Sequence, residues 1–227
     1  IQLTILVCVS TIAAAILVEI TGADDDVIVT RDRQLGPLSR LHLAERLIIA
    51  PYAISAEDEL QTVLTAPAHL PRVVWELRSA FHPLALRVAV GLGQLRSLPR
   101  RSGESIHEAG SGEAFDNARR ASERFQSRRG TKYPLLTAVC GVDPVLDAAV
   151  NGMYRLHDTL LLQISDRQWQ AVLAVEREGR QDLAAAELDI DESTISRALQ
   201  RAHHWQLQDA RRALAEILER WVPHPPG

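Results

Sequence analysis

The chain has 227 residues, which is enough for one large domain or two small ones. Hydrophobic residues make up 46% of it and charged residues 24%, which excludes a disordered chain and a collagen-like fibre. The formal net charge of −4 excludes a protein whose whole surface attracts nucleic acid, so any DNA contact must come from a local patch. The two cysteines, Cys8 and Cys140, form no C-x-x-C pair, so a disulfide scaffold and a zinc ribbon both lack ligands.

Residues 1–18 carry no charge. That length is at the lower limit for a membrane span, but several polar residues interrupt the run. No basic residues precede it, as they would in a signal peptide. We therefore expect a buried strand over about 13–20 with an extra apolar segment before it, no membrane contact and a cytoplasmic location.

Strand and helix signals alternate over residues 1–142. In chain order they predict a strand over 13–20, an acidic turn over 21–26, a helix from Ser39 to Ile49, a hairpin of strands 52–55 and 60–64, a helix over 68–81, a strand over 85–95, a loop over 96–112, a helix over 114–129 and a strand over 133–142. In the predicted strand over 85–95, large residues alternate with small ones, and Gly91 and Gly93 permit close backbone approach. This order predicts an antiparallel-rich sheet with helices on one face, an α+β arrangement.

From Pro144 onward the pattern is helical almost throughout. We expect a first domain over 1–142, a connecting helix over 143–163 and an all-α domain over 164–227. Ser165 and Gln168 have the spacing of a capping box. Three short helices are predicted there, over 165–178, 181–188 and 192–204.

The stretch RQDLAAAELDIDESTISRALQRA, residues 180–202, has the pattern of a helix-turn-helix and is similar to the DNA-binding region of sigma factors. Ala184 and Ala185 allow two helices to cross closely, and Asp189 tolerates the left-handed backbone of a tight turn. Four apolar residues are expected to fill the wedge between the helices: Leu188, Ile190, Ile195 and Leu199. The side chains expected to meet phosphates and base edges of DNA are Ser193, Thr194, Ser196, Arg197, Gln200 and Arg201.

The net negative charge of this region argues against DNA binding. Residues 165–204 contain five arginines and eight acidic residues, a net charge of −3, whereas phosphate contacts require basic side chains. A helical bundle used only for dimerisation or partner binding therefore remains an alternative. DNA binding remains the leading hypothesis because Arg197 and Arg201 lie one turn apart on the third helix, where Glu192 is the only acid.

Several segments of the chain resemble the SatD family, a group of bacterial proteins. The segments are ITGADDDVIVTR, PYAISAEDELQTVL, RVAVGLGQL and GSGEAFDNARRASERF, and the helix-turn-helix belongs to the same family pattern. The first domain is also similar in plan to nucleotide cyclase and GGDEF domains, which have a ferredoxin-like sheet. Those enzymes hold two divalent metals between a carboxylate after the first strand and another at the hairpin turn.

Two acidic clusters, at a strand end and at a hairpin tip, suit Mg²⁺, which prefers carboxylate and phosphate oxygens. The resemblance implies Asp26 as the first metal ligand, with Glu19 as a rival, and Asp58 or Glu57 as the second. However, the glycine of the Gly-Asp-Glu-Phe-like turn is missing from Glu57-Asp58-Glu59-Leu60. An acidic side chain at that position would repel a phosphate.

Arginines recur at four-residue intervals along the helix predicted over 114–129, at positions 120, 124 and 128. One helix face of positive charge suits phosphates. The resemblance places Asn117 and Arg120 where cyclases have a transition-state-stabilising Asn and Arg, and we expect Asn117, Arg120 and Arg124 to bind a nucleotide. If the Asn-to-Arg spacing of four is kept, however, Asp116 falls at the Asn position.

These observations favour a bacterial DNA-binding transcriptional regulator whose cyclase-like domain has a degenerate, nucleotide-sensing site. One alternative is a Mg²⁺-dependent enzyme that forms or cleaves a nucleotide phosphodiester. The other is a protein that oligomerises through its helices without binding DNA. A homodimer is compatible with each hypothesis.

Overall fold

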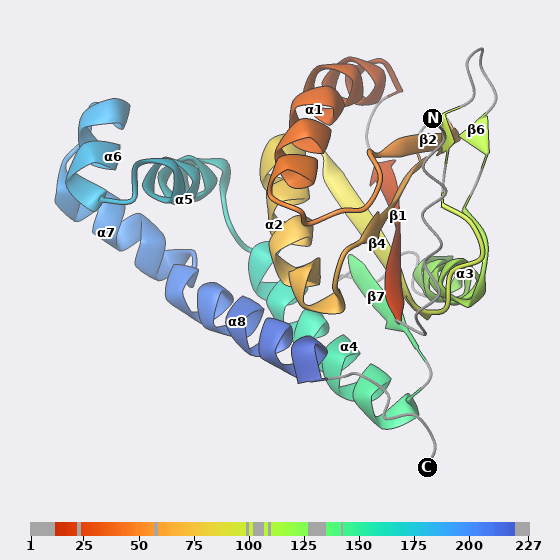
Figure 1. Cartoon of the computed structure of the whole chain (residues 1–227). Helices are drawn as coiled ribbons and strands as arrows, with labels where there is room; N and C mark the ends of the chain where they lie inside the picture. The colour runs from red at the N-terminus through yellow and green to blue at the C-terminus, as the bar shows by residue number, and fades with distance from the viewer. Residues whose placement is uncertain are drawn as a thin grey trace.

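The computed structural model describes residues 12–21, 24–56, 59–98, 100–101, 107–108, 110–126, 135–141 and 143–220. The described chain is a mixed α/β structure built on a five-stranded mixed sheet (Figure 1). The strands of this sheet are β1 (Ala13–Thr21), β2 (Ala53–Ala56), β3 (Glu59–Leu64), β4 (Ala85–Gly93) and β7 (Thr137–Cys140). A separate two-stranded sheet consists of β5 (Arg100–Arg101) and β6 (His107–Glu108).

Helices connect these strands and form the C-terminal part. They are α1 (Asp24–Ala44), the 3-10 turn η1 (Pro67–His69), α2 (Leu70–Phe81), α3 (Glu113–Gln126), α4 (Pro144–Leu161), α5 (Asp166–Glu178), α6 (Gln181–Leu188), α7 (Glu192–Arg201) and α8 (His204–Arg220). The predicted alternation of strands and helices before residue 142 is confirmed in outline, as are the β2–β3 hairpin and the helical pattern after Pro144. The loop predicted over 96–112 is wrong at β5 and β6, which pair with each other.

The first helix differs from its prediction. It begins at Asp24, directly after β1, and ends at Ala44, so Ser39 lies inside the helix. The Ser39 hydroxyl accepts a hydrogen bond from the backbone N–H of Tyr52 at 3.1 Å instead of capping a helix start. The chain leaves the helix before Ile49 because residues 48–49 pair with the end of β3, where the Ile49 N–H donates to the Val63 carbonyl at 2.8 Å.

In the main sheet the strand order is β2-β3-β1-β4-β7. The first three neighbouring pairs are antiparallel, and β4 and β7 are parallel, so the antiparallel-rich prediction is confirmed. In the central strand β1, Glu19 lies opposite Glu59 of β3 on one side and Arg87 of β4 on the other. The carboxyl end of β1 is therefore next to the start of β3, where the β2–β3 hairpin turns.

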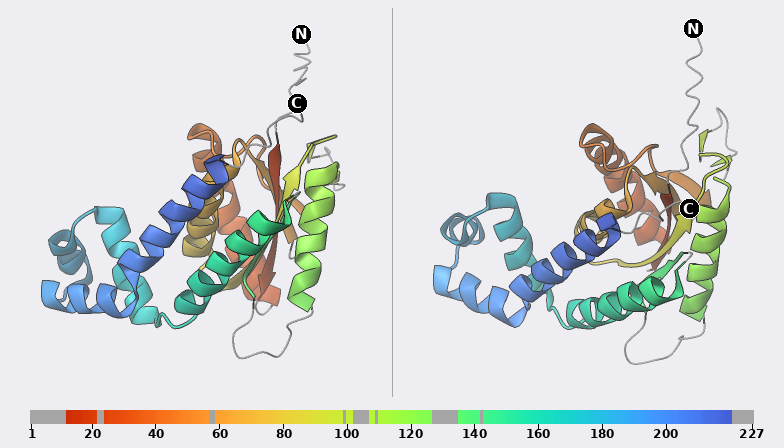
Figure 2. Two further views of the ribbon diagram at one scale, coloured as in Figure 1. Left: turned by 90° about the horizontal axis from the view of Figure 1, so that it is seen from below. Right: turned by 60° about the horizontal axis from the view of Figure 1, so that its bottom comes forward.

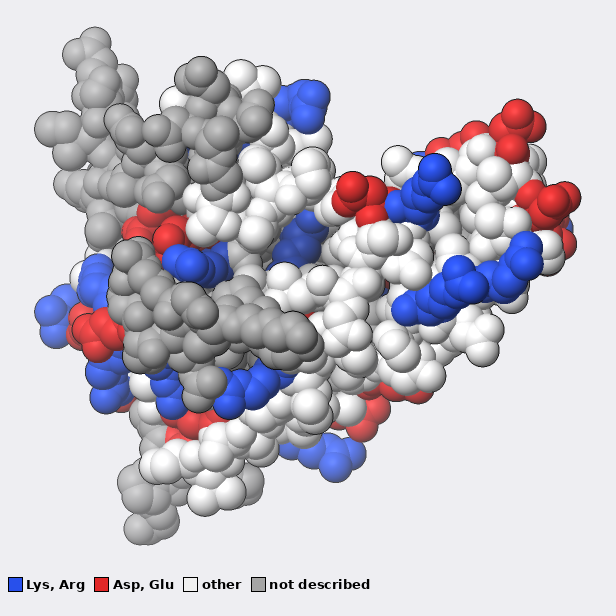
Figure 3. All heavy atoms as spheres, turned by 180° about the vertical axis from the view of Figure 1, so that it is seen from behind, with Lys and Arg blue, Asp and Glu red and all other residues white. Residues whose placement is uncertain are grey.

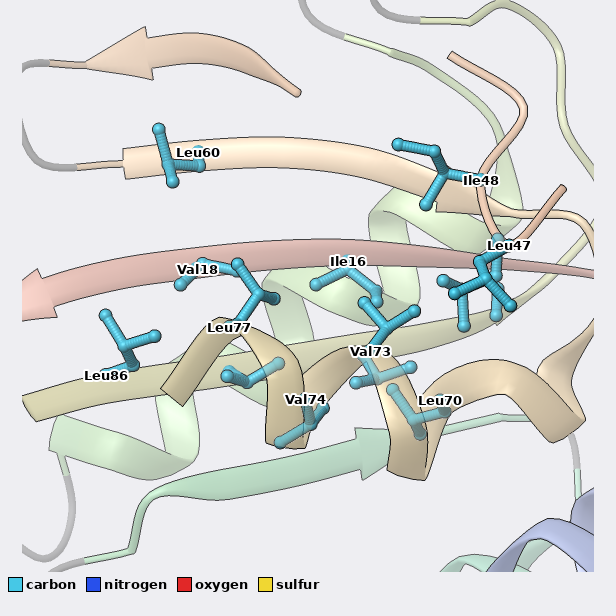
Figure 4. Packing of buried hydrophobic residues seen from close by; sticks show 14 of the residues in the cluster. Ile16, Val18, Leu47, Ile48, Leu60, Leu70, Val73, Val74, Leu77 and Leu86 are labelled. Atoms are coloured by element: carbon cyan, nitrogen blue, oxygen red, sulfur yellow. The ribbon is translucent and has the colours of Figure 1, made fainter. Parts of the chain in front are cut away.

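Large side chains cover one face of the sheet. Ile16 and Val18 of β1 lie on this face and pack with Val73 and Leu77 of α2 in one buried cluster (Figure 4). The cluster extends to Leu35 and Leu38 of α1, Val150 and Tyr154 of α4, and Leu214 and Leu218 of α8. This is the larger of the two layers that surround the sheet.

Small side chains cover the opposite face, where α3 packs alone among the described helices (Figure 2). On the strands this face is built mostly from the small residues Ala13, Ala15, Ala89, Gly91 and Ala138, together with the larger Leu17 and Val63, and on α3 from Ala114, Ala118, Ala121 and the larger Phe115 and Phe125. The prediction that helices cover only one face is therefore wrong. Because β1 is apolar at nearly every position, both of its faces must be buried.

Gly91 shows how closely α3 approaches β4. A Cβ atom at this position would lie 1.9 Å from the Ala114 carbonyl oxygen and 2.1 Å from the Ala118 nitrogen. At Gly93 an added Cβ would lie 2.9 Å from the Ala114 nitrogen. The expectation that these glycines permit close backbone approach is confirmed.

β7 is the last strand of the sheet, and α4 lies along its outer edge. The Asn151 side chain accepts a hydrogen bond from the Val139 N–H at 2.9 Å and donates to the Val139 carbonyl at 2.8 Å. One amide side chain thus satisfies both outward-facing backbone groups of Val139. This contact fixes α4 beside the sheet and blocks the edge from pairing with another chain.

A buried ion pair joins α2 to α4 and β7. Arg78 donates to a carboxylate oxygen of Asp158 at 2.8 Å and to the Thr137 hydroxyl at 2.7 Å, and Arg78 and Asp158 are 5% and 2% exposed. Burial by itself raises the pKa of Asp158, but the charge of Arg78 and the hydrogen bonds from Arg78 and His157 together outweigh burial and hold that pKa below its usual value. The pair therefore favours the charged carboxylate in the folded state.

The C-terminal helices return to the sheet domain. After α5, α6 and α7, helix α8 runs back so that Leu214 and Leu218 enter the cluster on the large-residue face (Figures 1 and 2). At the same junction Trp75 of α2 stacks on Trp169 of α5, with ring centroids 5.2 Å apart. The helices α5–α7, which we call the helical unit, thus stand away from the sheet but are fixed to it through α8 and these aromatic rings.

We expect Gly91→Ala to destabilise the fold, because its methyl group overlaps backbone atoms of α3 that cannot move without shifting the whole helix. The loss should be about 1–3 kcal/mol or more in the free energy of unfolding, measured by urea denaturation. Gly36→Ala in α1 is the matched control, because its Cβ makes only an ordinary 3.6 Å contact with the Arg40 side chain. A loss of the same size in both variants would contradict close α3 packing.

Asp158→Asn should lower the free energy of unfolding by about 3–5 kcal/mol at neutral pH, since it leaves the buried Arg78 without a counter-charge. The folded pKa of Asp158 is depressed, so its stabilisation is complete above the unfolded-state pKa of about 3.9 and is lost as the pH falls below that value. Urea titrations from neutral to acidic pH should show the gap between wild type and variant narrowing in acid. Asp32→Asn, at an exposed carboxylate, should show no such gap.

Candidate functional site

The helical unit is held together by a small apolar core. Ile195 and Leu199 of α7 are fully buried against Ala184 and Ala185 of α6 and the inner side of α5. Gln168 accepts a hydrogen bond from the Ser165 N–H at 2.8 Å, as the predicted capping box requires. The three helices therefore form a rigid support for the outer face of α7.

The turn between α6 and α7 has the predicted conformation at Asp189. Its φ of 52° and ψ of 50° are left-handed, and its N–H closes the end of α6. The predicted wedge is confirmed for Ile195 and Leu199, and Leu188 packs against the same core while half-buried. It is wrong for Ile190, which is 40% exposed because the turn points it away from the helices.

Helix α7 presents the predicted polar residues on its outer face. Thr194 is half-buried, and the exposed members are Ser193, Ser196, Arg197, Gln200 and Arg201. The Arg197 guanidinium lies along its own helix, donating to the Ser193 carbonyl at 3.1 Å and to the Thr194 hydroxyl at 3.3 Å. The structure thus brings the six residues together on one helix, and it holds Arg197 with weak local bonds that a phosphate or base could replace.

Charge is distributed unevenly among the arginines near this face. Arg177 is paired with Glu187, Arg180 with Asp182, and Arg211 with Glu176. Among the residues that the structure describes, neither Arg197 nor Arg201 forms an ion pair. Figure 3 shows a row of basic side chains crossing the helical end of the molecule, beside acidic side chains at its tip.

The junction between the helical unit and the sheet domain is a polar and aromatic cluster that the sequence did not indicate. Arg211 lies over the Trp75 ring, 3.8 Å from its centroid, and donates to Glu176 at 2.9 Å. The Trp75 indole N–H also donates to Glu176, and His82 stacks on Trp169. These residues come from α2, α5, α8 and the α2–β4 turn, so no spacing in the sequence relates them.

The predicted nucleotide residues lie on α3, but their contacts are largely internal. Asn117 is 2% exposed and donates to the Leu92 carbonyl at 2.6 Å, which anchors α3 to β4. Its side-chain oxygen accepts a hydrogen bond from Arg120. Asn117 therefore has a structural role, because both polar atoms of its side-chain amide are bonded within the protein and neither is directed at solvent.

Arg120 and Arg124 are exposed and lie near the end of β7. Arg124 donates to the Val139 carbonyl at 3.1 Å. Burial raises the pKa values of Cys140 and Asp147, and the two arginine charges oppose both shifts, which places all four side chains in one neighbourhood. Cys140 and Asp147 were not predicted there, because the grouping depends on how α3, β7 and α4 meet.

Of the predicted metal ligands, only the Glu19 side chain lies within the described residues. The Asp26 side chain, Asp58 and Glu57 lie outside the described residues, although the adjoining strands bring the end of β1 next to the start of β3. The rival ligand Glu19 is bound to Arg87, whose Nη1 lies 3.1 and 3.4 Å from its two oxygens. An arginine already neutralises Glu19, and the described residues contain no group of three His, Cys, Asp or Glu that could hold a metal.

No protein-family model and no curated protein matches the chain, so membership of the SatD family stays a prediction. Among solved structures, a bacterial light-regulated adenylyl cyclase is similar over 57% of this chain and 43% of its own, with 13% identity and a TM-score of 0.38. This chain thus spans less than half the length of that cyclase. The catalytic core of a rhodopsin-guanylyl cyclase with converted specificity, in complex with ATPαS, is similar over 50% of this chain and 72% of its own, with 10% identity and a TM-score of 0.36.

A regulator of polyketide synthase expression from Bifidobacterium adolescentis is similar over 94% of this chain and 82% of its own, with 13% identity and a TM-score of 0.27. Cyclase activity and the regulation of polyketide synthase expression are properties of these three proteins and are not attributed to this chain. Within the described ranges, no helix has the length and apolar character needed to cross a bilayer.

Proposed function

We propose that the chain is a DNA-binding transcriptional regulator that contacts duplex DNA with α7. The observation that carries the proposal is the outer face of α7, where two unpaired arginines one turn apart stand among hydroxyl and amide side chains. Arginine can bind guanine edges or phosphates, glutamine can bind adenine, and serine and threonine suit either base edges or phosphates.

The support behind α7 fits this role. A helix that enters the major groove must be held rigidly with its N-terminal residues leading. Buried Ile195 and Leu199 fix α7 to α5 and α6, and the left-handed Asp189 sets the angle at which α7 leaves the turn. The helical unit also stands clear of the sheet domain, so a duplex can reach α7 (Figure 1).

The net charge of this region bears on how strongly the proposed DNA binding should depend on salt. Residues 165–204 have a net charge of −3, but several of the acids in this region neutralise other arginines and leave Arg197 and Arg201 available. Few phosphate contacts are then made, so the salt dependence should be modest and base contacts should contribute much of the specificity. The SatD-like and sigma-factor-like segments are consistent with a regulator of this kind.

The second part of the proposal is that the cyclase-like domain senses a nucleotide or a similar anion. Arg120 and Arg124 are exposed where the parallel pair β4–β7 ends and α4 begins. In open sheets, ligands bind beyond the carboxyl ends of parallel strands. The alternative of a Mg²⁺-dependent phosphodiester enzyme has less support, because Asn117 is buried in a structural contact and Glu19 is paired with Arg87.

Arg197→Ala and Arg201→Ala should each weaken duplex DNA binding by about 1–3 kcal/mol, the usual contribution of a base contact. Fluorescence anisotropy with fragments from the protein's own genomic neighbourhood measures this, and circular dichroism verifies the fold. Arg212→Ala, at an exposed arginine of α8, should bind as wild type does. Binding that is unchanged in the Arg197→Ala/Arg201→Ala double variant would remove the DNA-binding hypothesis.

Arg120→Ala should weaken the binding of a nucleoside triphosphate by on the order of tenfold, because a charge-assisted hydrogen bond to phosphate is lost. Isothermal titration calorimetry with ATP and GTP measures the effect. Arg119→Ala is the control on the same helix, since Arg119 turns toward Asp116 at 3.0 Å. Equal affinities for wild type and both variants would place the ligand elsewhere, and no heat with any of them would leave the domain as a scaffold.

A further inference from the structure

Helix α4 has an apolar face that nothing in the described chain covers. Val145 and Leu156 are 80% and 70% exposed, the largest exposures among the large hydrophobic residues of the described chain. Ala148, Ala149 and Gly152 lie between them and are also exposed. Figure 2 shows no other helix outside α4 when the molecule is seen from below.

The spacing of this face is that of a helix–helix contact. Val145, Ala149, Gly152 and Leu156 are separated by four, three and four residues, the interval of the a and d positions in a coiled coil. Val150, Tyr154 and Leu161 occupy the opposite side of α4 and are buried in the core. The helix is therefore apolar on two sides. One side is buried in the core, and the other is exposed.

No described residue of this chain requires a glycine at position 152. A Cβ at this position would meet nothing within 4 Å, in contrast to Gly91, which α3 requires. Glycine in a helix interior is destabilising relative to alanine, so a residue with this cost needs a compensating contact. Close approach of a second helix backbone is the contact that a glycine permits and a larger side chain prevents.

We propose that this face of α4 is the contact surface of a homodimer in which two α4 helices cross antiparallel about a two-fold axis. The pattern is symmetric when read from either end, with a large residue, two small residues and a large residue. An antiparallel crossing pairs Val145 of one copy with the partner's Leu156, and Ala149 with the partner's Gly152. Such a self-complementary surface is what a two-fold interface requires.

Charge also favours a second copy in this orientation. The exposed acid at the N-terminal end of α4 is its N-cap residue, Asp143, and the exposed charge of its C-terminal half is Arg155. An antiparallel crossing places Arg155 near the acidic end of the partner helix and opposes the two helix dipoles favourably. A parallel crossing would place like charges together.

The size of the face predicts the strength of the dimer. Three helical turns with small central residues bury less than the total of about 1,200 Å² that is typical of stable complexes. The dimer should therefore exchange with monomer, with its population rising with concentration across the micromolar range. This inference is independent of DNA binding, because α7 lies on the separate helical unit.

Sedimentation velocity of the full chain at several concentrations tests the proposal. Wild type should show a concentration-dependent shift from monomer to dimer. Leu156→Glu and Val145→Glu should each weaken dimerisation by on the order of 100-fold, because a carboxylate must be desolvated in the contact. Both sites are exposed in one copy, so circular dichroism should show an unchanged fold.

Two further variants locate the contact. Val29→Glu makes the same change at another exposed apolar site, on α1, and should dimerise as wild type does. Gly152→Leu should abolish the dimer while leaving the monomer folded, since its side chain enters open space in one copy. A wild type that stays monomeric at all concentrations, or a dimer that survives Leu156→Glu and Gly152→Leu, would overturn the proposal. Loss of the dimer in Val29→Glu would also overturn it.

Discussion

Burial of the central strands on both faces is the constraint on which the rest of the structure depends. Residues of β1 and β4 alternate between large side chains, such as Ile16 and Val90, and small ones, such as Ala15 and Gly91. The large face needs a thick layer of helices, whereas the small face admits one helix at very short distance. Because the strand pleat alternates sides, one stretch of sequence specifies both layers.

This division also positions the candidate sites. The close approach of α3 carries Arg120 and Arg124 to the end of β7, and it buries Asn117 against Leu92. On the other face, the thick layer includes α2, whose Arg78 and Trp75 bind α4 and the helical unit. The position of α7 relative to the sheet thus follows from side chains on α2 as well as from the C-terminal helices themselves.

The junction connects the helical unit to the rest of the molecule. Trp75, Trp169 and Arg211 form a continuous set of contacts from α2 through α5 to α8. Dimerisation through α4 would act on the same network, because α4 shares the Arg78–Asp158 pair with α2.

The sequence by itself determined the order of the elements, the hairpin, the small-residue strand and the turn at Asp189. These features depend on local periodicity, backbone propensity and residue size, which neighbouring residues reveal. It also identified the polar face of α7, because those six residues lie within nine positions of one helix. Only the tertiary structure decided that helices cover both faces, that α1 begins at Asp24 and that Ser39 binds Tyr52 instead of capping a helix. The ion pair of Arg78 and Asp158 and the stack of Trp75 on Trp169 join residues 80 or more positions apart, so only the folded chain brings them together. The exposed apolar face of α4 was likewise decided only by the tertiary structure, because the sequence shows which residues are apolar but not which of them the fold buries.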